Sequence, residues 1–264
     1  MPKLSTQEKY VRCQKRTRRL ITLARLALFI AFLILWEFSA QTGMIDSFIF
    51  SSPSRMAETF LRMWKTESLG VQIGITLLET LTSFLLVTVL SLLTAILLWL
   101  CPRFSKILEP YLVILNSLPK SALAPLLIVW LGANMRTIIV AGLSVAIFGS
   151  IISLYTGFQE ISPDKLKLIY TLGGTRRHAL FKVILPASIP YLLSNMKVNI
   201  GLCLVGVIIG EFIGARQGLG YLIIYGSQVF KLNMVMMSIV ILCIIAMALY
   251  QAIHLIEKCY LKKL

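Results

Sequence analysis

Long apolar runs constrain this chain more than any other feature of its sequence. Six runs of roughly 20 residues or more lie at about 21–41, 72–100, 107–131, 136–158, 186–213 and 233–256, and a helix needs about 20 apolar residues to cross a membrane. The whole chain is 58% hydrophobic and 14% charged, with a mean hydropathy of +0.84, whereas soluble domains carry about 25% charged residues. We therefore predict an all-α integral membrane protein with about six transmembrane helices.

The distribution of lysine and arginine predicts how the chain is oriented, because loops on the cytoplasmic side of a membrane are enriched in these residues. If the amino terminus is inside, 18 of the 26 lysines and arginines fall on the cytoplasmic side and six on the outer side. Both termini are then cytoplasmic, with a basic segment at 1–20, a transmembrane domain at 21–258 and a tail at 259–264. The net charge of +15 follows from this topology and indicates no nucleic-acid partner.

Two segments depart from a simple series of straight spans. Pro119 and Pro125 interrupt the third run, and proline removes a helix hydrogen bond, so this span is expected to be kinked or broken. Between the first two spans, residues 55–64 read RMAETFLRMW. This pattern predicts an amphipathic helix that lies along the outer membrane interface.

Charged side chains within the spans are candidates for function, because such residues are costly to place in a membrane. Lys120 lies at the predicted break and fits a position that lines a pathway. Lys197 lies in the fifth span and either lines a pathway or extends toward the inner surface. Glu211 lies in the run Gly206-x3-Gly210-x3-Gly214, whose small residues indicate close helix packing, and it is a candidate gate or a polar link across a dimer. Glu79 has threonines nearby in the sequence, and we expect their hydroxyl groups to form hydrogen bonds with its carboxyl group.

A basic, helix-forming insert at about 161–185 separates the fourth and fifth spans. Ser162-Pro163 can begin a first helix, and Gly173-Gly174 can end it. A second helix, capped by Thr175, is expected to follow. The spacing of Gly173, nine residues and then Val183-Ile184-Leu185-Pro186 resembles the cytoplasmic loop with the EAA motif in the permease subunits of bacterial ABC importers.

Further motifs extend this resemblance over about residues 50–258. They are Pro53-Ser54, Glu109-Pro110, Leu118-Pro119, Pro125-Leu126, Trp130-Leu131-Gly132, Gly210 to Ala215, and Gly218 to Leu222. Together they resemble permeases of the nitrate, sulfonate, taurine and thiamine-precursor group. The resemblance implies a type I ABC-importer fold, a bacterial inner-membrane location and a role as the subunit that forms the translocation pathway.

The resemblance also implies partners. A second copy of the chain would complete the pathway, a cytoplasmic ABC ATPase dimer would dock on the insert, and an extracytoplasmic binding protein would deliver substrate. A short amphipathic helix can bind in the groove of a partner through apolar anchors. The expected ATPase-coupling residues are the anchors Leu168, Tyr170 and Leu172, the polar contacts Lys167, Arg176 and Arg177, and the turn residue Gly173.

One part of the insert departs from the family pattern. The acidic residue and two alanines of the motif fall on Lys167, Leu168 and Ile169. Lysine reverses the charge of the expected contact, so either the ATPase carries a compensating acidic residue or the contact is dispensable. Two other interpretations of the insert stay open. It is a solvated basic loop held to anionic lipid, or Leu168 and Leu172 pack on the spans of the protein itself.

The sequence indicates no chemistry carried out by the chain alone. It contains no G-x-x-x-x-G-K-[ST] phosphate loop, so a partner would bind and hydrolyse ATP, and we expect no cofactor on this chain. Its two histidines and five cysteines lack the spacing of a metal or catalytic site. We therefore expect a transport subunit that is not itself an enzyme. An ATP-independent secondary transporter or channel is the alternative function.

Overall fold

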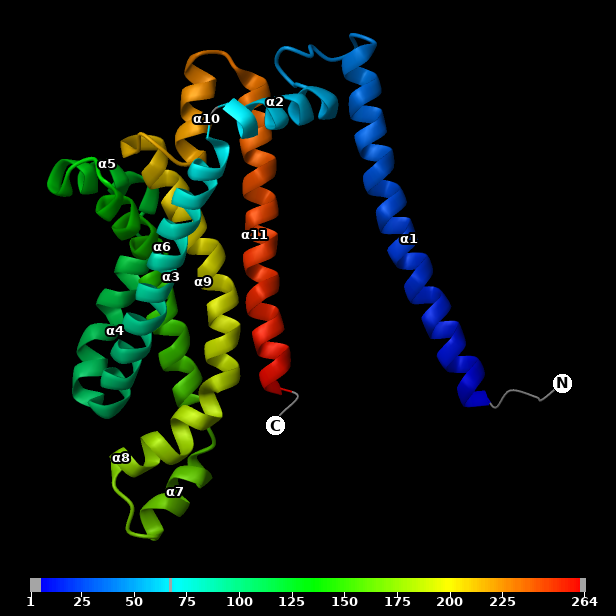
Figure 1. Cartoon of the computed structure of the whole chain (residues 1–264). Helices are drawn as coiled ribbons and strands as arrows, with labels where there is room; N and C mark the ends of the chain where they lie inside the picture. The colour runs from blue at the N-terminus through cyan, green and yellow to red at the C-terminus, as the bar shows by residue number, and fades with distance from the viewer. Residues whose placement is uncertain (1–5, 67, 262–264) are drawn as a thin grey trace.

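The computed structural model describes residues 6–66 and 68–261, and the regular structure in those ranges is helical (Figure 1). The helices are α1 (Thr6–Gln41), α2 (Pro53–Thr66), α3 (Leu69–Leu100), α4 (Pro102–Ser117), α5 (Lys120–Leu131), α6 (Met135–Gln159), α7 (Pro163–Thr171), α8 (Arg176–Ala179), the π-helical turn η1 (Leu180–Ile184), α9 (Leu185–Gly214), α10 (Leu219–Gln228) and α11 (Leu232–Leu261). Parts of the predicted basic segment 1–20 and tail 259–264, namely 1–5 and 262–264, lie outside the described residues.

The number of membrane spans agrees with the prediction. Within the described ranges, five helical segments are long and apolar enough to cross a membrane: Arg19–Gln41, Leu69–Leu100, Met135–Gln159, Arg176–Gly214 and Leu232–Tyr260. The third predicted span is a pair of helices, α4 and α5, bent by 94°, and counting this pair as one span gives six. The expected break is thus confirmed. It falls at Leu118-Pro119, where Leu118 is extended because a following proline disfavours helical geometry.

Helices α3, α6 and α9 pack together as the core of the bundle, and α6 and α9 meet at a seam of small residues. A Cβ atom on Gly206 would lie 2.8 Å from the Cα atom of Gly142 and 3.0 Å from the carbonyl oxygen of Ala141. A Cβ atom on Gly210 would lie 3.2 Å from that of Ala141. The packing seam predicted from the glycine spacing is confirmed, since only glycine permits this approach of two helix backbones.

A buried polar network joins the same three helices near the middle of the core. Ser150 of α6 donates a hydrogen bond to the hydroxyl of Ser91 in α3 at 2.8 Å. The side-chain amides of Asn195 and Asn199 in α9 donate to the Ser150 hydroxyl at 2.7 and 2.8 Å. Polar side chains in a membrane are stabilised by such bonds across helices, so the network fixes how the three helices face one another.

Helix α1 stands apart from the bundle, and α2 lies across one end of it, which we call the α2 end (Figure 1). The two helices are joined by Glu37, whose carboxylate accepts hydrogen bonds from the backbone N–H and the hydroxyl of Ser54 at 3.0 and 2.7 Å. Helix α2 confirms the amphipathic helix predicted at 55–64. Its Met63 is buried in a cluster with residues of α10 and α11, and its crosswise position fits a place at the membrane interface.

The opposite end, which we call the α7 end, carries α7 and α8 together with the N-terminal end of α1 and the C-terminal end of α11 (Figure 1). Thr175 begins α8 as predicted. The prediction of a separate second helix is wrong, because α8, η1 and α9 form one continuous helical segment, Arg176–Gly214. The π-helical turn Leu180–Ile184 absorbs the local change of direction, so the insert is continuous with the fifth span.

The α6–α9 seam leads to a stability prediction. Gly206→Ala places a Cβ atom against the backbone of α6 and should lower the free energy of unfolding by about 1–3 kcal/mol, as overpacking does. Gly201→Ala is the matched control on the same helix, because its Cβ would meet nothing within 4 Å. Unfolding in detergent should separate the two variants, and equal stability would contradict the packing described here.

Candidate functional site

Helix α7 and the turn after it form a defined projection at the α7 end (Figure 1). The helix ends in two backbone hydrogen bonds, from Gly174 N–H to the oxygen of Ile169 at 2.9 Å and from Gly173 N–H to the oxygen of Tyr170 at 3.0 Å. Gly173 has a φ of 77°, the left-handed conformation that closes a helix in this pattern. The turn predicted at Gly173 is therefore confirmed.

The outward side of α7 carries the three predicted anchors. Leu168, Tyr170 and Leu172 are 60%, 46% and 76% exposed. Leu166 and Ile169 instead pack against a buried cluster at this end of the bundle. The interpretation in which Leu168 and Leu172 pack on the protein's own spans is therefore wrong, because α7 buries its other side.

The basic residues of the insert have different surroundings. Lys167 pairs with Asp164 of its own helix at 3.2 Å, and both side chains are largely exposed. The Arg176 guanidinium donates a hydrogen bond to the carbonyl oxygen of Trp99 at 2.6 Å and lies 4.9 Å from the centroid of its ring. This bond and the cation–π contact attach α8 to the C-terminal end of α3. Arg177, the next residue, is exposed.

At the α2 end, Glu211 lies at the centre of a buried cluster of polar groups. Its carboxylate accepts hydrogen bonds from the Thr76 hydroxyl at 2.7 Å and from Gly220 N–H at 2.5 Å. The Thr76 hydroxyl oxygen accepts from Leu219 N–H at 2.9 Å, and the Gln72 side chain accepts from Gly218 N–H at 2.5 Å. Side chains of α3 and α9 thus satisfy the free N–H groups at the start of α10, where a negative charge is also favoured.

Glycine is required in this cluster because the backbone of α10 approaches the carboxylate closely. A Cβ atom on Gly218 would lie 2.3 Å from an oxygen of Glu211, and one on Gly220 would lie 2.7 Å from the other. Gly218 also has a φ of 109°, which side chains other than glycine rarely adopt. Within one chain, Glu211 therefore connects the start of α10 to the core, and its predicted role as a gate or a link across a dimer stays a prediction.

The surroundings of Glu79 differ from those expected. Thr76 bonds to Glu211, and the Thr82 hydroxyl donates to the oxygen of Leu78 in its own helix. Glu79 is 1% exposed, its carboxyl group lies beside that of Glu211, and its Oε2 atom has no hydrogen-bond partner among the described residues. The prediction that nearby threonines satisfy Glu79 is wrong, because the Thr76 hydroxyl donates to Glu211 and the Thr80 hydroxyl has no hydrogen-bond partner among the described residues.

The remaining pathway candidates lie in separate places. The Lys120 ammonium group donates to the carbonyl oxygens of Leu115 and Asn116 at 2.5 and 2.9 Å, which closes the C-terminal end of α4. Lys197 of α9 forms an ion pair with Glu257 of α11. The structure thus assigns each lysine a local partner and does not gather Lys120, Lys197 and Glu211 into one site. Their roles along a pathway stay predictions.

A family of known proteins shares this arrangement. Its sequence model matches residues 87–256, which is more than half of the chain, and the family is described as binding-protein-dependent transport system inner membrane component. The chain is a member of this family. The matched range of the permease runs from the middle of α3 into α11 and includes the α7–α8 insert and Glu211.

Several relatives are themselves permeases. The chain is 30% identical over 221 residues to a probable ABC transporter permease protein of Haemophilus influenzae, covering 84% of this chain and 89% of the relative. It is 27% identical over 195 residues to the formylaminopyrimidine transport permease protein ThiX of Halalkalibacterium halodurans, covering 73% and 76%. With a taurine transport system permease and a nitrate import permease also among the relatives, the group predicted from the motifs is confirmed.

Solved structures confirm the fold. The permease resembles a chain of the MetNI methionine ABC transporter in inward-facing conformations, with a TM-score of 0.65 and 20% identity, covering 72% of this chain and 95% of that one. It also resembles a chain of a bacterial alginate ABC transporter, with a TM-score of 0.61 and 14% identity, covering 91% and 94%. The permease is thus the membrane-spanning subunit of an ABC importer, and nothing in these comparisons supports an ATP-independent transporter.

Sequence reasoning missed two residues that organise these sites. The contact of Trp99 with Arg176 could not be predicted, since 77 residues separate the two and no local pattern links them. Thr76 is one of the threonines that the sequence predicts to satisfy Glu79, and nothing in its local pattern indicates Glu211 as its partner. The spacing of Gly218 and Gly220, seven and nine residues after Glu211, was a usable signal, because paired glycines often mark a close approach of backbone to another group.

The Glu211 cluster leads to a second stability prediction. Thr76→Val removes the hydroxyl that bonds to both Glu211 and Leu219 N–H, and leaving a buried donor unsatisfied should cost about 1–3 kcal/mol of unfolding free energy. Thr82→Val on the same helix removes a hydroxyl that bonds to its own helix and should have a smaller effect. Thermal or denaturant unfolding in detergent measures both, and a larger loss in the control would refute the proposed link.

Proposed function

We propose that two copies of this permease enclose the translocation pathway of an ABC importer. A cytoplasmic ABC ATPase dimer docks on α7 and α8, and an extracytoplasmic binding protein delivers substrate at the α2 end. The ATPase binds and hydrolyses ATP, so the permease itself needs no cofactor and catalyses no reaction. Both ends of the chain are cytoplasmic in this proposal, because the excess of lysine and arginine lies on the side of the α7 insert.

The exposed side of α7 is the observation that carries the proposal. Leu168, Tyr170 and Leu172 are exposed on α7, a short helix at the end of the bundle (Figure 1), and basic residues lie beside them in the sequence. An exposed apolar patch bordered by polar groups is typical of a protein interface, and a helix in a groove is a common way to fill one. Lys167, Arg177 and the three anchors are the contacts we propose with the ATPase.

The α7 element is connected to the core in two ways, so movement of a docked ATPase can reach the pathway. Arg176 attaches α8 to α3 through Trp99, and α8 continues into α9. In this proposal Arg176 is a positioning residue that transmits movement within the permease. This differs from the direct ATPase contact expected from the sequence.

The packing of the core favours a pathway between subunits. Val87, Ala95, Ala146 and Cys203 are 0% exposed where α3, α6 and α9 meet, and the glycine seam brings two of these helices into contact. A solute cannot pass through such a packed interior. The proposed pathway therefore runs along the outside of this core and is completed by a second copy.

Docking through α7 is tested by replacing its anchors. The double variant Leu168→Ser, Leu172→Ser should weaken binding of the transporter's ABC ATPase by about tenfold or more, since burying a leucine side chain contributes about 1.5–3 kcal/mol. Ile256→Ser is the control, because Ile256 is also an exposed residue, 57% accessible, at the same end but on α11. Co-purification measures binding, and retention of the ATPase by the folded double variant would overturn the docking assignment.

The turn at Gly173 provides a sharper test, because the chain contains a matched glycine. Gly173 and Gly43 have φ values of 77° and 75°, and a Cβ atom on either would meet nothing within 4 Å. Alanine at either position therefore introduces a similar backbone strain, about 1–2 kcal/mol, without a clash. Only Gly173→Ala should reduce both ATPase co-purification and the stimulation of ATP hydrolysis by the permease. A similar loss in Gly43→Ala would show a general effect on folding and contradict a specific role for the turn.

A further inference from the structure

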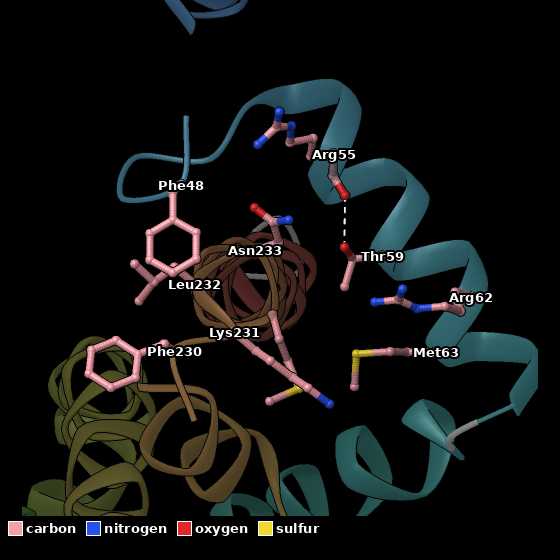
Figure 2. A pocket seen from close by; sticks show the side chains of 10 residues that line it. Phe48, Arg55, Thr59, Arg62, Met63, Phe230, Lys231, Leu232 and Asn233 are labelled. Atoms are coloured by element: carbon pink, nitrogen blue, oxygen red, sulfur yellow. Dashed lines mark hydrogen bonds between the residues drawn. The ribbon is translucent and has the colours of Figure 1, made fainter. Parts of the chain in front are cut away.

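A basic pocket lies at the α2 end, between α2 and the turn that joins α10 to α11 (Figure 2). It has a volume of about 410 Å³. Arg55, Arg62 and Lys231 line it, and the part of the chain that the structure describes contributes no Asp or Glu to its wall. These are three of the six basic residues that charge counting assigns to the outer side, so the pocket gathers half of that charge.

The positive charge of the pocket is not neutralised within the chain. Among the ion pairs of the described residues, none includes Arg55, Arg62 or Lys231. Glu58, the acidic residue of α2, is exposed, does not line the pocket and takes part in none of these pairs. Like charges around one space repel each other, so a negatively charged occupant is favoured.

The pocket lies on the polar side of α2. Arg55, Thr59 and Arg62 line it and are four and three residues apart, so they share one side of the helix. Met56 and Phe60 lie on a different side, where they pack against the buried cluster that includes residues of α10 and α11 and line an apolar groove beside α11. An amphipathic helix at a membrane interface turns its apolar side to the lipid and its polar side to water. We therefore expect the occupant to come from the aqueous phase rather than from the hydrocarbon.

The positive groups of the pocket are spread over more space than one small ion fills. Arg55 and Arg62 are seven residues apart on α2, about 10 Å along the helix axis. The Arg55 guanidinium donates a hydrogen bond to the carbonyl oxygen of Ser47 at 3.2 Å, whereas Arg62 and Lys231 extend into the space between α2 and the α10–α11 turn (Figure 2). A single phosphate or sulfate ion is smaller than this separation. A segment with several carboxylates can pair with all three side chains.

Exposed aromatic side chains border the same pocket. Phe48 and Phe230 line it and are 58% and 68% exposed, and Figure 2 shows both rings on the side of the pocket away from α2. Arginine and phenylalanine are both enriched where proteins bind one another. Separate positive charges beside exposed rings are therefore typical of a surface that receives a protein segment.

We propose that this pocket receives an acidic segment of the extracytoplasmic binding protein, whose carboxylates pair with Arg55, Arg62 and Lys231. The inference rests on the proposed function, in which that protein docks at the α2 end, and it adds the chemistry of the contact. The polar side of α2 disfavours a lipid headgroup as the occupant, and the spread of the charges disfavours a free ion. Complementary charges at an interface mainly speed association, so the pocket guides the binding protein to the α2 end.

The test measures the rate at which the transporter's binding protein associates with the permease–ATPase complex in nanodiscs of phosphatidylcholine. Arg62→Gln with Lys231→Gln removes two pocket charges, and Arg62→Lys with Lys231→Arg keeps both. Lys65→Gln is the matched control, because Lys65 lies on α2 but does not line the pocket. Co-purified ATPase shows that each variant is folded. Hexaglutamate and inorganic phosphate are the competitors, and nanodiscs that contain phosphatidylglycerol test the effect of anionic lipid.

We expect association with the wild type to slow as sodium chloride rises from about 0.05 to 0.5 M, because salt screens the charges. The double Gln variant should associate about tenfold more slowly at low salt and lose most of this salt dependence. Lys65→Gln and the charge-keeping variant should associate as the wild type does. Hexaglutamate should slow association with the wild type, and inorganic phosphate should have little effect.

Equal association of the wild type and the double Gln variant would overturn the acidic contact and leave docking at the α2 end intact. A binding protein that associates with neither the wild type nor any variant would overturn the proposed function as well. Phosphate that competes as strongly as hexaglutamate would assign the pocket to a free ion. Slower association with the wild type alone when the nanodisc contains phosphatidylglycerol would assign it to a lipid headgroup, and either result would overturn the proposal.

Discussion

The contact between α6 and α9 is the constraint on which the rest of the structure depends. Gly142 and Gly206 let the two backbones meet, and Ser150 then bonds to Ser91 of α3 and to two asparagines of α9. Close packing and a satisfied polar network reinforce one another in a membrane, where no hydrophobic driving force holds helices together. This core is a closely packed frame, with the α7–α8 insert at one end and the Glu211 cluster at the other.

The segment Arg176–Gly214 links those ends. At the α7 end, Arg176 contacts Trp99 at the end of α3, and at the α2 end, Glu211 contacts Thr76 near the start of α3. The α7–α8 insert and the polar cluster under α10 are therefore attached to the same two helices. In the proposed mechanism, a shift of this segment relative to α3 carries the movement of a docked ATPase to the α2 end.

Predictions from local sequence patterns were correct where neighbouring residues alone determine the structural feature. The apolar runs, the break before Pro119 and the left-handed turn at Gly173 follow from backbone chemistry within a few residues. The prediction of a separate second helix in the insert failed because α8 continues through the π-helical turn Leu180–Ile184 directly into α9. The prediction of hydrogen-bond partners for Glu79 failed because Thr76 bonds instead to Glu211 of α9, and α9 is distant in the sequence.

The sequence by itself determined the class of protein, the approximate number of spans, the family and the position of the α7–α8 insert, because these depend on composition, spacing and nearest-neighbour geometry. Only the tertiary structure decided that Arg176 faces inward to Trp99 while Leu168 and Leu172 face outward, and that Arg62 and Lys231 share one pocket. The direction of a side chain depends on which helices pack beside it, and that packing is set by contacts between residues far apart in the chain.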